Sequence, residues 1–184
     1  MNQENAIQRL LCAASFAAHK HTAQRRKDAQ ASPYINHPLA LADMLANEAS
    51  VTDIEVLCAA LLHDTIEDTE TTAEELRNMF GAAVAGVVQE VTDNKSLPKQ
   101  TRKDLQVSHA PHLSAKAKLV KLADKICNLR DIVAAPPADW TPERKREYFE
   151  WTRRVVDGMR GSHAQLELIF DETYRCGMES IARA

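Results

Sequence analysis

Hydrophobic residues recur through most of the chain at the three- and four-residue spacing of amphipathic helices. The segment 117–132 illustrates the pattern with a single apolar stripe: Leu119, Leu122, Ile126 and Leu129. No stretch of the sequence sustains the two-residue alternation of strands, and the chain has only five glycines. We therefore predict an all-α fold, a helical bundle with little or no sheet. The predicted helices cover residues 4–22, 38–48, 53–66, 72–80, 82–92, 99–108, 114–133, 142–159 and 162–176.

Helix starts and breaks are marked by local residue types. Thr141 followed by Pro142 is typical of a helix entry with proline in its first turn. Three further starts have capping-box spacing: Thr52 with Glu55, Thr72 with Glu75, and Ser162 with Gln165. The breaks are short and polar or contain proline: Ala29–Pro33, Asp93–Pro98, Ala110–His112 and Ala135–Asp139. None resembles an interdomain linker, so residues 1–184 are predicted to form one domain.

The composition excludes several classes of protein. Hydrophobic residues make up 45% of the 184 residues and charged residues 27%, which is too apolar for a disordered chain. A net charge of −3 gives no overall attraction to nucleic acid. The longest apolar run, Val56–Leu62, is too short for a membrane span, and the first residues lack a secretory signal pattern. We predict a cytoplasmic protein without nucleic-acid or membrane partners.

The four cysteines are widely scattered and include no C-x-x-C pair. Cys12, Cys58 and Cys127 lie within apolar helical patterns, whereas Cys176 is near the end of the last predicted helix. We expect the first three to be buried, reduced thiols rather than metal ligands or disulfide partners.

The segment VLCAALLHDTIEDT carries the strongest chemical signal. On a continuous helix, His63 stacks with Glu67 and Asp64 with Asp68, and the four side chains share an arc of roughly 140°. Three carboxylates this close repel each other unless a cation or a shared proton offsets their charge. The alternative is a solvated helix end capped by His63. The fully apolar run before the doublet favours a buried metal site.

A His–Asp pair cannot complete a metal site alone, and two distant residues are candidates for the rest. His37 lies between Pro33 and Pro38, which stiffen the backbone at a helix entrance. Asp124 lies off the apolar stripe of its helix and stacks with Asn128. The alternatives are a structural histidine and, for Asp124 with its neighbouring lysines 121 and 125, a salt-bridged surface face.

Three motifs in this order, PYINHP, HDTIEDT and KLADKICNLRD, resemble the HD-type hydrolases of the RelA/SpoT group. The similarity is greatest to the stand-alone small alarmone hydrolases, the metazoan SpoT homologue among them, and it covers nearly the whole chain. It implies a single HD domain in which one divalent ion, usually Mn²⁺, is bound by His37, His63, Asp64 and Asp124. Two imidazoles and two carboxylates also suit Fe or Zn, and the ligand types do not choose among the three.

The resemblance also implies a reaction. Glu67 and Asp68 would assist a metal-bound water that removes the 3′-pyrophosphate of guanosine tetra- or pentaphosphate (ppGpp or pppGpp), giving GDP or GTP and pyrophosphate. The partner is then a small nucleotide, whose charge requires local cations on a slightly acidic protein. The implied substrate contacts are Arg26 and Lys27 near the nucleotide, Lys99 and Arg144 near phosphates, and Asn128 and Tyr148 near the ribose.

Two other functions fit the same scaffold. One is a phosphatase that removes the 2′-phosphate of NADPH, which also presents a phosphorylated ribose to a metal-bound water. The other is a non-catalytic HD module that senses or binds a nucleotide. The second is disfavoured because the chain keeps all four candidate ligands and the Glu67–Asp68 pair. No oligomeric state is predicted.

Overall fold

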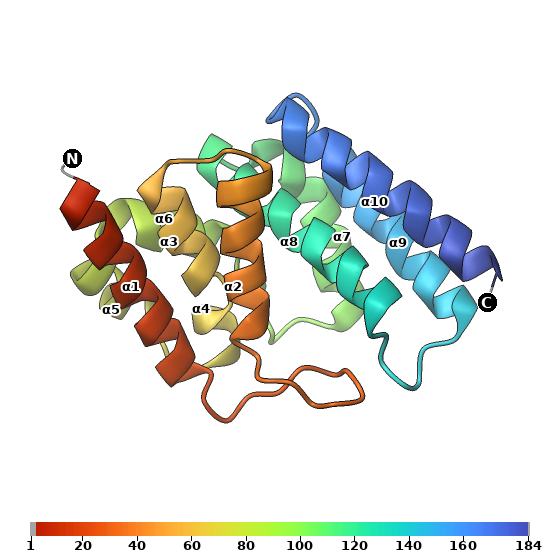
Figure 1. The fold of residues 1–184 in the computed structure, drawn as a ribbon, viewed down its shortest axis with the longest axis horizontal. Helices are drawn as coiled ribbons and strands as arrows, with labels where there is room; N and C mark the ends of the chain where they lie inside the picture. The colour runs from red at the N-terminus through yellow and green to blue at the C-terminus, as the bar shows by residue number, and fades with distance from the viewer. Residues whose placement is uncertain (1–2, 184) are drawn as a thin grey trace.

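A computed structural model describes residues 3–183 and places them in a helical bundle (Figure 1). Within this range the only β-structure is an isolated bridge between Arg25 and Pro33, so the all-α prediction is confirmed. No described helix is both long and apolar enough to cross a membrane. The elements in chain order are α1 (Gln3–Lys20), α2 (Asn36–Asp43), the π-helical η1 (Met44–Glu48), α3 (Ile54–Leu62), α4 (Thr65–Asp68), α5 (Ala73–Phe80), α6 (Ala82–Val91), α7 (Lys99–His109), the 3₁₀-helical η2 (Ala110–His112), α8 (Ala115–Ala134), α9 (Pro142–Asp157) and α10 (Ala164–Arg183).

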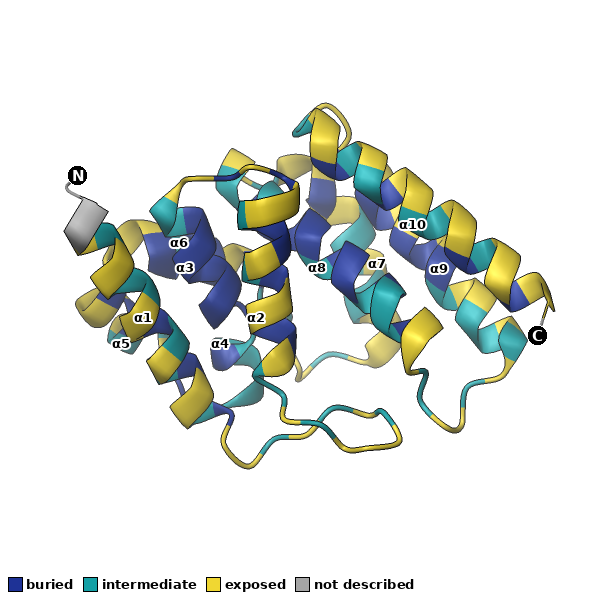
Figure 2. Ribbon diagram, viewed as in Figure 1, coloured by how far each residue is buried: buried dark blue, intermediate teal, exposed yellow. Residues whose placement is uncertain are grey.

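Helices α3 and α8 form the centre of the bundle. Helix α3 contacts α1, α2, α6 and α8, and every residue of its Val56–Leu62 segment is buried (Figure 2). Helix α8 contacts α2 and α3 on one side and α9 and α10 on the other. A helix that is apolar on all faces needs neighbours on all faces, which explains the central place of α3. The first turn of α2 and the middle of α8 are therefore held close to the end of α3.

The predicted helix over 53–66 is wrong at its second half. Helix α3 ends at Leu62, His63 and Asp64 form a turn, and the short helix α4 follows. Asp64 adopts φ −99° and ψ −2°, outside ideal helical values, although the Asp68 amide still donates to the Asp64 carbonyl at 2.8 Å. The four polar side chains therefore do not project from one continuous helix, and each is directed separately.

Two of the four predicted helix entries are confirmed. Thr72 accepts a hydrogen bond from the Glu75 amide, and Thr141 accepts one from the Arg144 amide with Pro142 in the first turn. The other two are wrong because a neighbouring residue takes the position.

Asp53, not Thr52, caps α3 by accepting from the Glu55 amide. The Ser162 hydroxyl donates backward to the Met159 carbonyl, while His163 accepts from the Leu166 amide at the start of α10. Helix α10 also continues to Arg183, beyond the predicted end at residue 176.

The described cysteines are free thiols, as predicted, but their burial differs from the expectation. Cys58 and Cys127 are buried, whereas Cys12 is exposed, because α1 lies on the surface and turns that residue outward. Burial raises the pKa of Cys58 to about 11 and that of Cys127 to about 12, so both remain protonated at neutral pH.

Candidate metal centre

His37 lies in the first turn of α2 and is 4% exposed. Its amide donates to the Tyr34 carbonyl at 3.0 Å, which anchors the helix entrance between the two prolines of PYINHP. Its Nδ1 is buried without a hydrogen-bond partner among the described residues, and the nearest carboxylate oxygen on that side, Oδ2 of Asp131, is 3.8 Å away. Nε2 faces the interior of the bundle.

His63 lies at the end of α3 and is 5% exposed. Its Nδ1 is 2.8 Å from the Ala60 carbonyl, which can only accept, so Nδ1 carries a proton and Nε2 is directed inward. Nε2 is buried and makes no well-aligned hydrogen bond within residues 3–183, although Oδ2 of Asp64 is 2.9 Å away. A buried imidazole nitrogen fixed in this way is suited to coordinating a metal.

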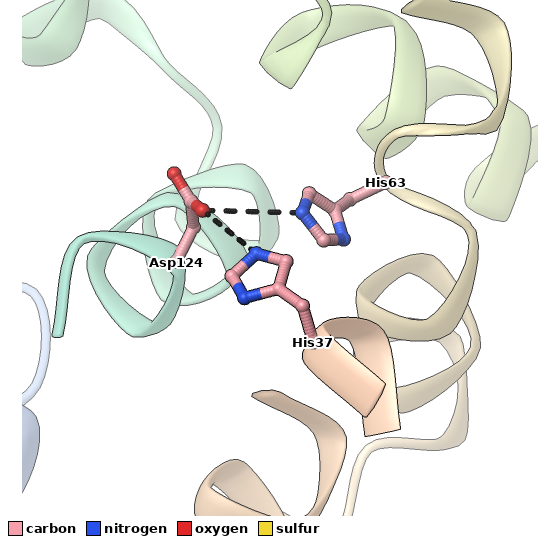
Figure 3. A group of neighbouring side chains, drawn as sticks. All are labelled: His37, His63 and Asp124. Atoms are coloured by element: carbon pink, nitrogen blue, oxygen red, sulfur yellow. Dashed lines mark ion pairs between the residues drawn. The ribbon is translucent and has the colours of Figure 1, made fainter. Parts of the chain in front are cut away.

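Asp124 brings the third group from the middle of α8 (Figure 3). Its Oδ1 lies 3.3 Å from Nε2 of His37 and 3.9 Å from Nε2 of His63, and the ligand atoms of the three residues all fall within 4.8 Å of one another. Oδ2 points instead toward Nζ of Lys125 at 3.3 Å, and Asn128 donates to Oδ1 at 2.5 Å. The structure thus gathers three of the four predicted ligands into one cluster.

Asp64, the fourth predicted ligand, adjoins this cluster. Its Oδ2 is 2.9 Å from Nε2 of His63 and accepts a 2.5 Å hydrogen bond from the Tyr34 hydroxyl. Tyr34 was not predicted, although it lies within PYINHP, three residues before His37. Burial is the main cause that raises the pKa of Tyr34, so its hydroxyl stays protonated and donates to the carboxylate.

The acid–base properties of the cluster reflect unbalanced negative charge. Burial alone would raise the pKa of Asp124, but the Lys125 ammonium and the two imidazoles hold it well below its usual range. Burial would likewise lower the pKa of His63, but Asp64 and then Asp124 raise it to about 9. A proton therefore occupies His63 at neutral pH in the absence of another cation. Mixed imidazole and carboxylate donors around a buried, negatively charged point fit a divalent transition metal.

The surface interpretation of this helix face is wrong. Lys121 is 8% exposed and Lys125 is 3% exposed, so both lysines are buried beside Asp124. Lys121 donates to the Val91 carbonyl at 2.9 Å, and burial is the main cause that lowers its pKa. The charged face of α8 points into the bundle because α6 and α9 pack against this helix.

Glu67 and Asp68 occupy different environments. Together with the four candidate metal ligands, Glu67 lines a cavity of about 150 Å³, which we call the inner cavity. Its carboxylate accepts a hydrogen bond from the Asp93 amide at 3.0 Å. Burial raises the pKa of Glu67. Asp68 lines the larger cavity alongside, where it pairs with Lys95 and accepts from Gln24 at 2.6 Å. Only Glu67 shares the inner cavity with the metal cluster.

The larger cavity, about 660 Å³, borders the metal cluster through Tyr34, His37 and Asn128. It is large enough for a nucleotide-sized ligand. Four of the six predicted substrate contacts line it: Arg26, Lys27, Asn128 and Tyr148. Lys99 and Arg144 do not line it. Lys99 is exposed at the start of α7, and Arg144 stacks on Trp140 at 4.7 Å and pairs with Asp139 at 3.1 Å.

Three further residues of the cavity escaped prediction. Asp131 pairs with Arg26, Trp140 lies in the loop after α8, and Lys95 lies in the loop after α6. Asp131 had a usable signal, because it follows Asp124 by two helical turns and so shares its face. The two loop residues had none, since the loops carry no periodicity that relates them to the site.

Known proteins provide an independent comparison. An HD-domain family profile matches residues 13–151. The chain is 57% identical over 158 residues to a Danio rerio protein named guanosine-3′,5′-bis(diphosphate) 3′-pyrophosphohydrolase MESH1, covering 86% of this chain and 88% of that one. The Homo sapiens protein of the same name is 58% identical over 158 residues, with the same coverage.

A solved structure is similar in both sequence and fold. It superposes with a TM-score of 0.88 at 49% identity and covers 91% of this chain and 94% of the other. That structure is described as a metazoan orthologue of SpoT that hydrolyses ppGpp.

Proposed function

The chain belongs to the HD-domain family, and from that premise we propose that it removes the 3′-pyrophosphate of ppGpp and pppGpp in a metal-dependent hydrolysis. The products are GDP or GTP and pyrophosphate. The observation that carries the proposal is the cluster of His37, His63 and Asp124 beside a nucleotide-sized cavity lined by cations. The names of the similar proteins support this substrate over NADPH.

The proposed metal ligands are His37, His63, Asp64 and Asp124, and the proposed ion is Mn²⁺. Buried Nε2 of His63 and the 3.3 Å approach of Asp124 to His37 support a cation at this point. A bound divalent ion would supply a water of lowered pKa and polarise a phosphoryl oxygen. In this proposal Asp64 turns from its hydrogen bond with Tyr34 to complete the set.

Glu67 is the proposed base. Its carboxylate lines the inner cavity, and its raised pKa makes it a stronger proton acceptor than an exposed glutamate. The Asp93 amide donates to Oε2 of Glu67, and Oε1 lies 4.0 Å from Nη1 of Arg102. Asp68 is proposed to assist from the larger cavity, where Gln24 and Lys95 hold its position.

The larger cavity is the proposed nucleotide site. Water attacks the phosphorus bonded to O3′, the P–O3′ bond breaks, and O3′ gains a proton. Arg26 and Lys27 are proposed to contact the base or its phosphates from the loop between α1 and α2. Burial raises the pKa of Tyr148, so its hydroxyl remains a donor, and with Asn128 it is proposed to hold the ribose. Lys99 and Arg144 are proposed to attract phosphates from the rim.

A direct assay tests the function. Purified protein is freed of metal, reloaded with Mn²⁺, Fe²⁺ or Zn²⁺, and given ppGpp, and GDP and pyrophosphate are followed by anion exchange. We expect turnover that a chelator abolishes and that His63→Ala lacks. His112→Ala, which removes an exposed histidine, is the matched control and should retain activity. Release of phosphate from NADPH without turnover of ppGpp would contradict the proposal.

A further inference from the structure

Two lysines that no prediction assigned to the substrate lie against one indole ring. Nζ of Lys125 is 4.6 Å and Nζ of Lys103 is 4.9 Å from the centre of the Trp151 ring. The Trp151 Nε1 donates to the Lys103 carbonyl at 3.1 Å, which ties α9 to α7 at this point. Trp151 is 9% exposed, so its ring forms a fixed, nearly buried platform for both ammonium groups.

Lys125 connects this platform to the metal cluster. Its side chain is 4% exposed, it lines the inner cavity, and its Nζ lies 3.3 Å from Oδ2 of Asp124. That oxygen is the one directed away from the two histidines, so Lys125 does not occupy the proposed metal position. An ammonium carries three donors, and contacts with one carboxylate oxygen and one indole face leave capacity for an anion.

Lys103 extends the positive charge outward. Its Nζ also lies 5.9 Å from the centre of the Tyr148 ring, which lines the larger cavity. Burial lowers the pKa of Lys103, and the nearby cations Lys99, Lys125 and Arg144 lower it further, while Glu147 raises it. Lys125 and Arg144 are already paired with Asp124 and Asp139, and an anion bound at Lys103 would offset the remaining repulsion among these cations.

We propose that Lys125 and Lys103 bind the pyrophosphoryl group of the substrate, Lys125 at the phosphate beside the metal and Lys103 at the distal phosphate. The inference rests on the proposed function and deepens it. A distal phosphate exists only when the 3′ position carries a diphosphate, so Lys103 would determine the preference for a diphosphate over a monophosphate at this position. Lys125 would serve either group.

Binding of inorganic pyrophosphate tests the site without any turnover. Isothermal titration is done with metal-free protein in chelator, since a metal ion would itself bind pyrophosphate. We expect Lys103→Gln and Lys125→Gln each to weaken binding about ten-fold, as for the loss of one hydrogen bond to a charged group. Arg146→Gln is the matched control, because it removes one positive charge from the exposed, opposite face of α9.

If all three variants bind pyrophosphate equally weakly, the loss comes from overall charge, and the proposed site is wrong. Unchanged binding in Lys103→Gln would overturn the assignment of the distal phosphate. Thermal unfolding checks that each variant folds, and Lys103→Gln decides the test if the buried Lys125→Gln does not fold, because Lys103 is partly exposed.

Inhibition measurements test the preference. Guanosine 5′-diphosphate 3′-monophosphate and ppGpp are compared as ligands of the wild type and of Lys103→Gln, with ppGpp turnover providing KM and kcat. We expect the variant to raise the KM for ppGpp about ten-fold and to leave the affinity for the monophosphate unchanged. Equal losses for both ligands would overturn the proposal. Absence of ppGpp turnover in the wild type would count against the proposed function, whereas pyrophosphate binding would still decide this site.

Discussion

The two ends of the candidate site are built differently. The inner end, which is the metal cluster with its small cavity, takes its side chains from helices and from the turn that joins α3 to α4. Its histidines are buried. The outer end, the larger cavity, takes most of its charged groups from the loops after α1 and α6, whereas the loop after α8 contributes uncharged residues. There, ion pairs such as Lys95 with Asp68 and Arg26 with Asp131 hold the side chains.

This difference separates two tasks. A metal cluster needs atoms held within tenths of an ångström, which packed helices provide. A nucleotide site must admit and release its ligand, and partly exposed ion pairs exchange partners at little cost in free energy. We therefore expect changes at the inner end to abolish chemistry and changes at the outer end to alter KM.

The largest effect is expected for Asp124→Asn. The amide keeps the shape of the side chain but removes the charge that faces both histidines, so Mn²⁺ affinity and hydrolysis should both fall on the order of a thousand-fold or more. Metal binding is measured by titration and activity by GDP release. Asp104→Asn, an exposed carboxylate on α7, is the matched control. Full activity in Asp124→Asn would remove this residue from the metal site.

Glu67→Gln should lower kcat about a hundred-fold or more while leaving metal affinity nearly unchanged, because a proton acceptor is lost and no ligand is. The same variant should be more stable than the wild type at pH 7 in the metal-free state. Burial raises the folded-state pKa of Glu67 above its usual 4.5, so ionisation at neutral pH opposes folding.

The raised pKa of Glu67 determines the pH range in which Glu67→Gln is more stable than the wild type. The advantage of Glu67→Gln is present above the raised folded-state pKa and disappears as the pH falls through 4.5, where the wild-type carboxyl is protonated in both states. Thermal unfolding between pH 4 and 8 measures it. A variant less stable than the wild type at pH 7 would show that the hydrogen bond from the Asp93 amide outweighs the burial of charge.

Arg26→Gln tests the outer end. We expect the KM for ppGpp to rise about ten-fold with little change in kcat or metal affinity, since the variant removes the charge-assisted contact with the nucleotide that we propose for Arg26. Arg25→Gln is the matched neighbour. Its guanidinium donates to the Thr22 and Gln24 carbonyls, so a smaller effect is expected. A large fall in kcat in Arg26→Gln would contradict the expectation that changes at the outer end alter KM alone.

The smallest effect is expected in the helical frame outside both ends. Thr72→Ala removes the N-cap of α5 and should lower the free energy of unfolding by about 1 kcal/mol without changing KM or kcat. Ser162→Ala should cost less, because that hydroxyl does not cap a helix. Denaturant unfolding of both variants makes the comparison, and equal losses would contradict the capping assignment.

Local patterns predicted the helices well and their junctions less well. The turn at His63 and Asp64 was missed because VLCAALLHDTIEDT contains no glycine or proline to mark a break. The turn arises from tertiary contacts instead: His63 bonds back to Ala60, and Asp64 meets Tyr34. Asp53 and Thr52 are both good capping residues, so the sequence alone could not place the first residue of α3.

In the candidate site, residues that lie in sequence motifs were predicted, whereas contacts between distant segments were not. His37, His63 and Asp124 were predicted because each lies in a motif, and the structure brings them together. The burial of Lys125 and the pairing of Arg26 with Asp131 were not predictable, because each depends on a segment far away in the chain. Charged residues on a helix look solvent-exposed in a sequence unless their cover is known.

The three clustered ligands come from widely separated segments of the chain, and this affects the stability of the protein. An ion that joins α2, the end of α3 and α8 acts as a cross-link, and the unfolded chain cannot present the same three atoms together. The free energy of unfolding then rises with the logarithm of the free metal concentration. Scarcity of the metal would shorten the time that each molecule survives proteolysis, in addition to slowing its reaction.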